Sequence, residues 1–182
     1  VSGTNGKTTT VSLLQAILTA DGCLALAGGN IGIPLTNLVD SMTAGVIVVE
    51  ASSFQLETTC HFKPRISALL NITPDHLDRH KSMEGYIKAK SRIFSNQKRD
   101  DYAVLNYEDQ HIRTMAKDCP ARIVYFSSQR VLGEGAFIKD GLIYFVLDNK
   151  VMPICSIQEV FLRGHHNLEN ILCAVAVAAI AG

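Results

Sequence analysis

The stretch Gly3-Thr4-Asn5-Gly6-Lys7-Thr8-Thr9 decides the fold and stands near the start of a 182-residue chain. Its two glycines allow a tight turn that brings backbone N–H groups toward phosphate oxygens. Lys7 supplies a mobile cation for the β- and γ-phosphates, and the Thr8 hydroxyl is a ligand for Mg²⁺. The helix expected at residues 8–20 points its positive end at the same anion. This stretch therefore predicts a phosphate loop that binds a nucleoside triphosphate.

The loop departs from the full G-x-x-x-x-G-K-[ST] spacing, because Val1 stands where that pattern has its first glycine. A glycine-rich turn with a chance Lys-Thr pair is the alternative that this departure leaves open. Only Val1 and Ser2 precede Gly3, although a phosphate loop normally follows a complete strand, and the chain stops at Gly182 directly after an expected helix. We therefore expect an internal domain of a longer protein.

The alternation of strands and helices predicts an α/β fold, with a doubly wound, mostly parallel sheet flanked by helices. Residues 137–154 differ, because two short polar turns separate three apolar runs, which predicts a small antiparallel patch. One domain over residues 1–182 accounts for all elements. Strands are expected at 24–27, 46–49, 66–72, 102–105 and 123–126, and helices at 8–20, 34–41, 82–96, 109–117 and 166–181.

The composition excludes several classes of protein. Lys and Arg total 17, Asp and Glu total 17, and the formal net charge is zero, so no nucleic-acid surface and no electrostatically held membrane surface are expected. The longest apolar stretch, residues 171–181, is too short to span a bilayer. Five scattered cysteines without a C-x-x-C pair indicate reduced thiols in a cytoplasmic protein.

Polar side chains follow two further expected strands, and ligands of open parallel sheets bind at the carboxyl ends of the strands. Glu50 comes directly after the strand at 46–49 and is a candidate Mg²⁺ ligand, with a helix-capping or surface role as the alternative. The loop at 73–80 gathers two carboxylates, two imidazoles and an arginine. His76 is its candidate functional residue, because it follows a strand beside the predicted nucleotide; a structural role is the alternative.

Lys90 falls on the apolar face of the helix expected at 82–96. It comes three residues after Ile87 and three before Ile93, which places it in the buried stripe. Lysines are almost never fully buried without a partner, and desolvation lowers the pKa of a lysine toward a neutral, nucleophilic amine. Two interpretations stay open: the stem snorkels its ammonium to water, or a reactive or modified group reaches into the site.

These motifs together resemble the Mur ligase family of ATP-dependent peptidoglycan enzymes. Matching blocks at 3–9, 50–56, 71–80, 86–90 and 164–170 occur in the family's order and cover essentially the whole chain as the family's central ATP-binding domain. The resemblance implies that the family's N-terminal UDP-binding and C-terminal amino-acid-binding domains are absent, so that this fragment alone is inactive.

Within the family, residues 28–34 and the run Ser52-Ser53-Phe54-Gln55-Leu56 are most similar to the member that adds D-glutamate. Lysine- or diaminopimelate-adding members and folylpolyglutamate synthases are the alternatives inside the superfamily. A nucleotide-binding regulatory module without ligase activity is a third hypothesis, from a different class of protein.

The resemblance implies a reaction and a set of site residues. ATP phosphorylates the carboxylate of UDP-MurNAc-L-alanine, and the amine of D-glutamate attacks the acyl phosphate. Thr8 and Glu50 bind one Mg²⁺, and His76 helps to bind a second. The lysine that matches Lys90 is usually carbamylated by CO₂, which turns it into a carboxylate-like Mg²⁺ ligand.

The implied roles divide the site into regions. Asn30 and Ser53 lie near the acyl phosphate, and Asn167 and Asn170 lie near the adenine, with N-capping as the alternative for Asn167. A bacterial, cytoplasmic monomer is expected. The implied catalytic residues are Lys7, Asn30, His76 and Lys90, and the implied nucleotide-binding residues are Gly3, Thr4, Asn5, Gly6, Lys7, Thr8, Thr9, Asn167 and Asn170.

Overall fold

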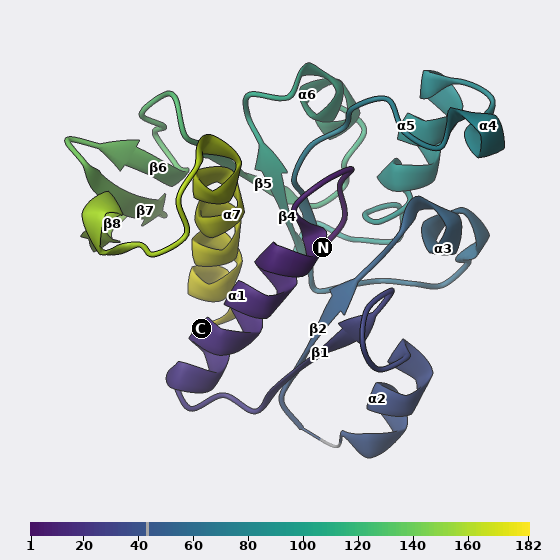
Figure 1. The fold of residues 1–182 in the computed structure, drawn as a ribbon, viewed down its shortest axis with the longest axis horizontal. Coiled ribbons are helices and arrows are strands. Elements are labelled where there is room, and N and C mark those ends of the chain that lie inside the picture. Colours follow the sequence, from purple (N-terminus) through teal and green to yellow (C-terminus); the bar gives the residue numbers. More distant parts are fainter. Residues whose placement is uncertain (43) are drawn as a thin grey trace.

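A computed structural model describes residues 1–42 and 44–182 of the chain. Helices and strands alternate over most of its length, as the sequence predicts (Figure 1). In chain order the elements are α1 (Lys7–Ala20), β1 (Ala25–Gly29), α2 (Leu35–Ser41), β2 (Val46–Glu50), α3 (Ser53–Thr58), β3 (Ile66–Leu69), α4 (Leu77–His80), α5 (Met83–Ser91), β4 (Tyr102–Asn106), α6 (Gln110–Ala116), β5 (Arg122–Ser127), β6 (Gly135–Lys139), β7 (Leu142–Leu147), β8 (Lys150–Ser156), the 3₁₀ helix η1 (Ile157–Glu159) and α7 (His165–Ala181).

The strands form a two-stranded sheet, β1-β2, and a six-stranded sheet in the order β3-β4-β5-β6-β7-β8. Neighbours from β3 to β6 pair in parallel, as do β1 and β2. The pairs β6-β7 and β7-β8 are antiparallel. The predicted α/β fold with a mostly parallel sheet is thus confirmed, and the antiparallel patch predicted at 137–154 extends from Gly135 to Ser156.

Val1 and Ser2 connect the two sheets. The Val1 amino group donates a 2.8 Å hydrogen bond to the Val49 carbonyl in β2, and the Ser2 N–H donates one of 2.9 Å to the Ala68 carbonyl in β3. Farther from the phosphate loop, a cavity of about 510 Å³ lies between β2 and β3 and is lined by apolar side chains of both. The hydrogen bonding therefore divides the single sheet that we expected, while the residues before the loop hold its two parts together.

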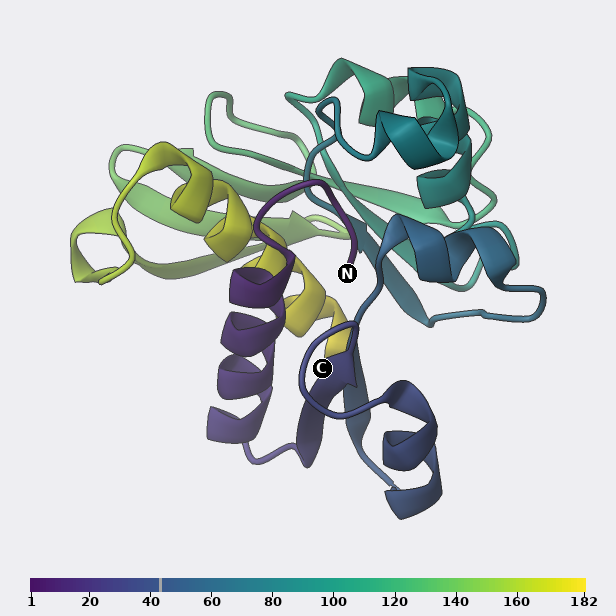
Figure 2. The ribbon, with the colours of Figure 1, turned by 45° about the vertical axis from the view of Figure 1, so that its right-hand side comes forward.

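Helices cover both faces of this sheet layer. α1 and α7 lie side by side over one face, and α3, α5 and α6 lie over the other (Figures 1 and 2). Successive side chains of a strand point to opposite faces. Along β4, Val104 accordingly packs in the core under α1 and α7, whereas Ala103 and Leu105 pack in the core under α5 and α6. The two cores fix the carboxyl ends of the strands, where the phosphate loop lies.

Two predicted boundaries are wrong. β3 ends at Leu69 rather than at residue 72, because the residues after it bond to the phosphate loop instead of to a neighbouring strand. The Asn71 carbonyl, for example, accepts a hydrogen bond from the Thr4 N–H. α5 ends at Ser91 rather than at residue 96. After it, the Ile93 N–H donates to the Lys90 carbonyl, three residues back, so the chain tightens into turns instead of continuing as an α-helix.

Two short α-helices were not expected. α3 begins with a capping box, in which the Ser52 hydroxyl accepts from the Gln55 N–H while the Gln55 side chain accepts from the Ser52 N–H. α4 occupies the end of the loop that we expected to be irregular. Both helices are a single turn or little more, which is too short for a periodic apolar pattern to reveal them.

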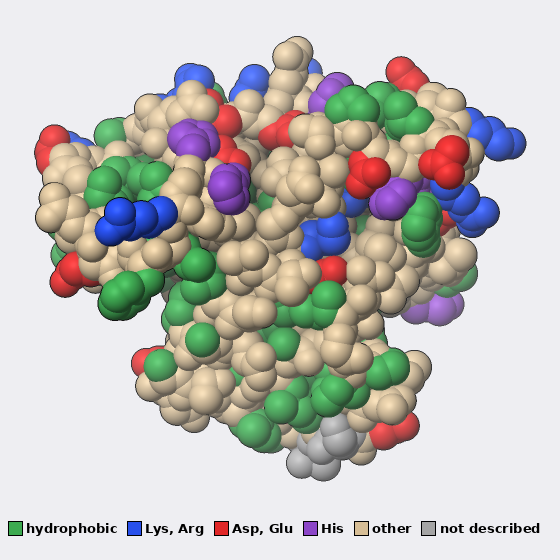
Figure 3. Space-filling view, viewed as in Figure 1, with side chains coloured by type: hydrophobic (Ala, Val, Ile, Leu, Met, Phe, Trp, Pro, Cys, Tyr) green, Lys and Arg blue, Asp and Glu red, His purple; other side chains and the backbone are tan. Residues whose placement is uncertain are grey.

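The face of the molecule in Figure 3 carries charged side chains of both signs over its upper part and apolar ones over its lower part. Exposed apolar side chains in and near β1 and α2 include Leu24, Ile33 and Val39. Of the described helices, none combines the length and the apolarity that crossing a membrane requires.

Candidate functional site

The phosphate loop turns into α1 at Gly6, whose φ of 82° lies in the left-handed region that favours glycine. No side chain caps this helix end, so the first-turn N–H groups of α1 are available to an anion. A Cβ atom at position 6 would also lie 2.1 Å from Asn170 Oδ1. Glycine is therefore required here both by the backbone conformation and by the close approach of α7.

The rest of the loop is held by the segment that follows β3. The Asn5 N–H donates a 2.8 Å hydrogen bond to Asn71 Oδ1, and Asn71 Nδ2 donates one of 3.1 Å back to the Asn5 carbonyl. The Thr4 hydroxyl accepts from the Thr73 N–H at 3.0 Å. Thr9 lies half-buried in the first turn of α1. These bonds hold the loop in shape through side chains and backbone that are distant in sequence.

Glu50 is buried at the end of β2, with 2% of its surface exposed. The Thr8 hydroxyl donates a 2.7 Å hydrogen bond to its Oε2, and Asn30 Nδ2 donates one of 3.0 Å to its Oε1. The surface and helix-capping alternatives for Glu50 are excluded, since the carboxylate is buried and Ser52 caps α3. A hydroxyl and a carboxylate side by side are the hard oxygen donors that Mg²⁺ prefers.

Lys90 is 1% exposed, so its ammonium does not snorkel to water. Its Nζ donates a 2.8 Å hydrogen bond to the Gly3 carbonyl and lies 4.7 Å from the centre of the Tyr86 ring. Burial, and after it the charge of the nearby Lys7, lowers the pKa of Lys90 to about 7. Near neutral pH a large share of this amine is therefore uncharged and nucleophilic.

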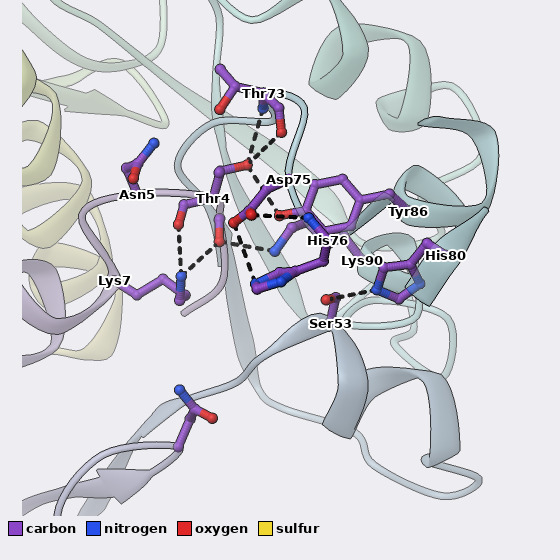
Figure 4. Close-up of polar contacts among 12 residues, drawn as sticks. Thr4, Asn5, Lys7, Ser53, Thr73, Asp75, His76, His80, Tyr86 and Lys90 are labelled. Carbon is purple, nitrogen blue, oxygen red and sulfur yellow. Dashed lines mark hydrogen bonds and ion pairs between the residues drawn. The ribbon is translucent and has the colours of Figure 1, made fainter. Parts of the chain in front are cut away.

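Lys7 folds back over its own loop. Its Nζ donates to the Gly3 carbonyl at 3.0 Å and to the Thr4 carbonyl at 2.8 Å. The amines of Lys7 and Lys90 thus share the Gly3 carbonyl, and Figure 4 shows both pointing to this loop. Two cationic groups converge where a polyanionic ligand would lie.

His76 stands beside Asp75 at the start of α4. Its backbone has a φ of 51°, and its Nε2 lies 3.3 Å from Asp75 Oδ2. The ring packs on Phe54 with centroids 4.9 Å apart, and about half of the side chain is exposed. The carboxylate, shown in Figure 4, and the aromatic ring together restrict the orientation of the imidazole.

A pocket of about 140 Å³ brings the predicted catalytic residues together. Lys7, Asn30, His76 and Lys90 all line it, although they come from four separate segments. The predicted substrate residue Ser53 lines it too, with Ser52, Phe54, Asp75 and Tyr86. The pocket is small and lies beside the phosphate loop. It is polar, because two lysines, Lys7 and Lys90, line it together with hydroxyl, amide and carboxylate groups.

The side chains of the site decide whether the two expected Mg²⁺ ions fit. Among the described residues, no three His, Cys, Asp or Glu side chains are grouped closely enough to hold a metal ion. Mg²⁺ is commonly bound by one or two carboxylates, with water and substrate phosphates completing its shell. The Thr8 and Glu50 oxygens fit one such ion. His76 and Lys90 fit a second ion only if Lys90 carries a carboxylate.

Asn170 of α7 lies against the phosphate loop, and Asn167 lies one turn before it. α7 begins at His165 after Gly164, one residue earlier than predicted, so Asn167 is inside the helix and N-capping does not explain it. Asn167 Oδ1 accepts a 3.3 Å hydrogen bond from Asn170 Nδ2. Asn170 is 3% exposed and faces Gly6. The pair is therefore well placed to contact a nucleotide held by the loop.

The pocket-lining residues Ser52, Phe54, Asp75 and Tyr86 were missed as individual candidates, and so was His80, which contacts Ser53 from behind. Tyr86 lies one helical turn before Lys90 on α5, a spacing that identifies it as a neighbour of that lysine. Its hydroxyl lies 3.1 Å from the Thr4 hydroxyl. The contacts of His80 cross from α4 to α3, and no local pattern indicates them.

The sequence of the chain is similar to those of known proteins. A family model described as the Mur ligase middle domain matches residues 1–178. The UDP-N-acetylmuramoylalanine–D-glutamate ligase of Thermoanaerobacter pseudethanolicus is 48% identical over 183 residues, covering 100% of this chain and 40% of that relative. The ligase of the same name from Acidobacterium capsulatum is 49% identical over 185 residues, with the same two coverages. The chain therefore spans about 40% of the length of these relatives.

Solved structures show the same fold. The structure of UDP-N-acetylmuramoyl-L-alanyl-D-glutamate–2,6-diaminopimelate ligase matches 100% of this chain and 42% of its own, with a TM-score of 0.77 and 27% identity. The MurF ligase of Thermotoga maritima in complex with ADP matches 100% of this chain and 44% of its own, with a TM-score of 0.72 and 21% identity.

Proposed function

Because the chain belongs to the Mur ligase family, as its middle domain, we propose that it forms the ATP- and Mg²⁺-binding part of an ATP-dependent carboxylate–amine ligase. The proposed reaction adds D-glutamate to UDP-MurNAc-L-alanine in peptidoglycan precursor synthesis, as the names of its relatives suggest. The observation that carries the proposal is the convergence of Lys7, Asn30, His76 and Lys90 on one pocket beside the phosphate loop.

The proposed chemistry has two steps. The carboxylate of UDP-MurNAc-L-alanine attacks the γ-phosphorus of ATP, and ADP leaves, which gives an acyl phosphate. The amine of D-glutamate then attacks the acyl carbon, loses a proton, and phosphate leaves from a tetrahedral intermediate. The protein contributes chiefly by positioning the reactants and by neutralising charge.

The phosphate loop binds the triphosphate in this scheme. The uncapped N–H groups of α1 donate to phosphate oxygens, with Gly3, Thr4, Asn5, Gly6 and Thr9 shaping the turn. Lys7 exchanges its bonds to the Gly3 and Thr4 carbonyls for bonds to the β- and γ-phosphates. Asn167 and Asn170 contact the adenine end of the nucleotide from α7.

Two Mg²⁺ ions, when bound, would neutralise the phosphate charge. Thr8 and Glu50 would hold one, and their 2.7 Å hydrogen bond already places the two oxygens together. His76 and a carbamylated Lys90 would hold the other. The neutral Lys90 amine adds to the carbon of CO₂ and releases a proton, and its pKa of about 7 supports this reaction at neutral pH.

The remaining pocket residues contact the acyl substrate. Asn30 and Ser53 line the same pocket as Gly3 and lie near the acyl phosphate in this scheme. Because the chain spans about 40% of its relatives' length, we propose that further domains bind the UDP group and the amino acid. The isolated chain is then inactive as a ligase, and the complete protein acts as a cytoplasmic bacterial monomer.

The test is a substrate screen with a complete ligase that contains this chain. ADP and phosphate are expected only when ATP, Mg²⁺, UDP-MurNAc-L-alanine and D-glutamate are all present. Equal turnover with lysine, diaminopimelate or a folate substrate would reassign the protein to another member of the superfamily. Nucleotide binding without turnover of any such substrate would point to a regulatory module instead.

A further inference from the structure

His80 lies directly behind the wall of the pocket without lining it. Its side chain comes from the last residue of α4 and is 8% exposed. Its Nε2 lies 3.0 Å from the hydroxyl of Ser53, which is 3% exposed and lines the pocket. Figure 4 shows the two side chains facing each other, Ser53 from α3 and His80 from α4.

The same imidazole packs against two more residues of the wall. Its ring stacks on Phe54, with centroids 5.5 Å apart and planes 21° apart, and contacts Tyr86 with centroids 5.3 Å apart. Ser53, Phe54 and Tyr86 belong to α3 and α5, so one buried ring connects two elements of the pocket.

The local backbone is arranged to bring His80 to this place. Its N–H donates to the carbonyl of His76, one turn earlier, which ties it to the predicted metal ligand. A Cβ atom at Gly85 would lie 2.4 Å from the His80 carbonyl, so only glycine lets the start of α5 approach α4 this closely. The position of His80 thus follows from the packing of two helices.

We infer that His80 is a positioning residue that orients the Ser53 hydroxyl and the Phe54 ring toward the carboxylate-bearing substrate. The inference rests on the proposed function and adds to it a residue that touches no reactant. A serine hydroxyl has one donor and two acceptor positions. With His80 occupying one of them, the others keep a fixed direction, and substrate binding orders fewer rotamers.

Two variants at position 80 separate its hydrogen bond from its stacking, in a complete ligase that contains this chain. H80F keeps an aromatic ring and removes the hydrogen bond, and H80Q keeps an amide near the Nε2 position without the ring. We expect H80F to raise the KM for UDP-MurNAc-L-alanine about tenfold, a factor typical of one lost hydrogen bond. The KM for ATP should change less than about twofold, and H80Q should recover most of the loss.

The S53A variant completes a double-mutant cycle. S53A alone should raise the same KM at least as much as H80F, because it removes the hydroxyl itself, and the S53A/H80F double variant should be no worse than S53A, because no hydroxyl remains for His80 to orient. H61F is the matched control, since His61 is an exposed histidine. It should leave every kinetic constant unchanged.

The outcomes separate this inference from the proposed function. An inactive wild-type enzyme, or one specific for another amino acid, overturns the proposed function itself. If the wild-type enzyme adds D-glutamate but S53A and H80F have additive effects, or leave the KM for UDP-MurNAc-L-alanine unchanged, His80 does not position Ser53. Should H80F fail to fold, an unchanged KM in S53A overturns the inference equally.

Discussion

Lys90 Nζ donates a 2.8 Å hydrogen bond to the Gly3 carbonyl, which is 87 residues earlier in the chain. The bond joins the last turn of α5 to the phosphate loop, and the amine that makes it is buried and also lies over the Tyr86 ring. The protonation of one side chain is therefore coupled both to the stability of the fold and to the shape of the nucleotide site.

The first prediction concerns stability against pH. The ordinary pKa of a lysine is 10.5, and burial lowers that of Lys90 to about 7. Between these values the unfolded chain binds one more proton than the folded one, so the folded state gains stability as pH rises. Lys90 adds at most about 1.4 kcal/mol per pH unit to the free energy of unfolding in this range. Below about pH 7 the cost of burying the charge is present in full.

Denaturant unfolding in CO₂-free buffer, with and without Lys90→Met, measures this slope. The free energy of unfolding of the wild type, minus that of the variant, should rise between about pH 7 and pH 10. Titrating groups that do not interact with Lys90 cancel in this difference. A difference that stays constant across this range would show that Lys90 keeps an ordinary pKa.

The second prediction concerns the proposed modification. Lys90→Ala should reduce ligase turnover on the order of 100-fold, because it removes charge stabilisation inside the site. Excess bicarbonate should not restore the activity, since no amine remains to react. The matched control is Lys88→Ala, which removes an exposed lysine of the same helix and should leave turnover unchanged. Near-normal turnover in Lys90→Ala would exclude the proposed role.

The third prediction concerns Glu50. Glu50→Gln keeps the size of the side chain but removes the negative charge beside the Thr8 hydroxyl. The Mg²⁺ concentration for half-maximal activity should rise at least about tenfold. Glu57→Gln is the control, because Glu57 is a more exposed carboxylate that pairs with Arg79. Equal Mg²⁺ requirements in the two variants would show that Glu50 does not bind the metal.

The fourth prediction concerns the loop glycine. Gly6→Ala should abolish measurable ATP binding, because the new methyl group would overlap the side chain of Asn170 and strain the turn. Gly22→Ala introduces similar strain, at a φ of 84°, but meets no atom within 4 Å. It should cost about 1 kcal/mol of stability and leave ATP binding intact. Calorimetric titration with ATP distinguishes the two variants, and binding by Gly6→Ala at wild-type affinity would contradict the prediction.

Much of the fold could be predicted from the sequence, because its signals are local. The phosphate loop depends on glycine, lysine and threonine at adjacent positions, and the apolar runs mark strands whatever they pair with. The position of Lys90 on the buried face of α5 also followed from a local pattern, since a helix places residues three apart on one face, but that pattern left open whether its ammonium reaches water. The short helices α3 and α4 escaped prediction because they contain too few residues for any period.

The sequence by itself determined which residue types stand at the ends of the strands and on the buried face of α5. Only the tertiary structure decided which of them meet. Glu50 joins Thr8 across 42 residues, and His80 joins Ser53 across 27. Such contacts depend on the order of the strands and on how closely the helices approach each other. Both are set by packing between distant segments, and no spacing along the chain encodes them.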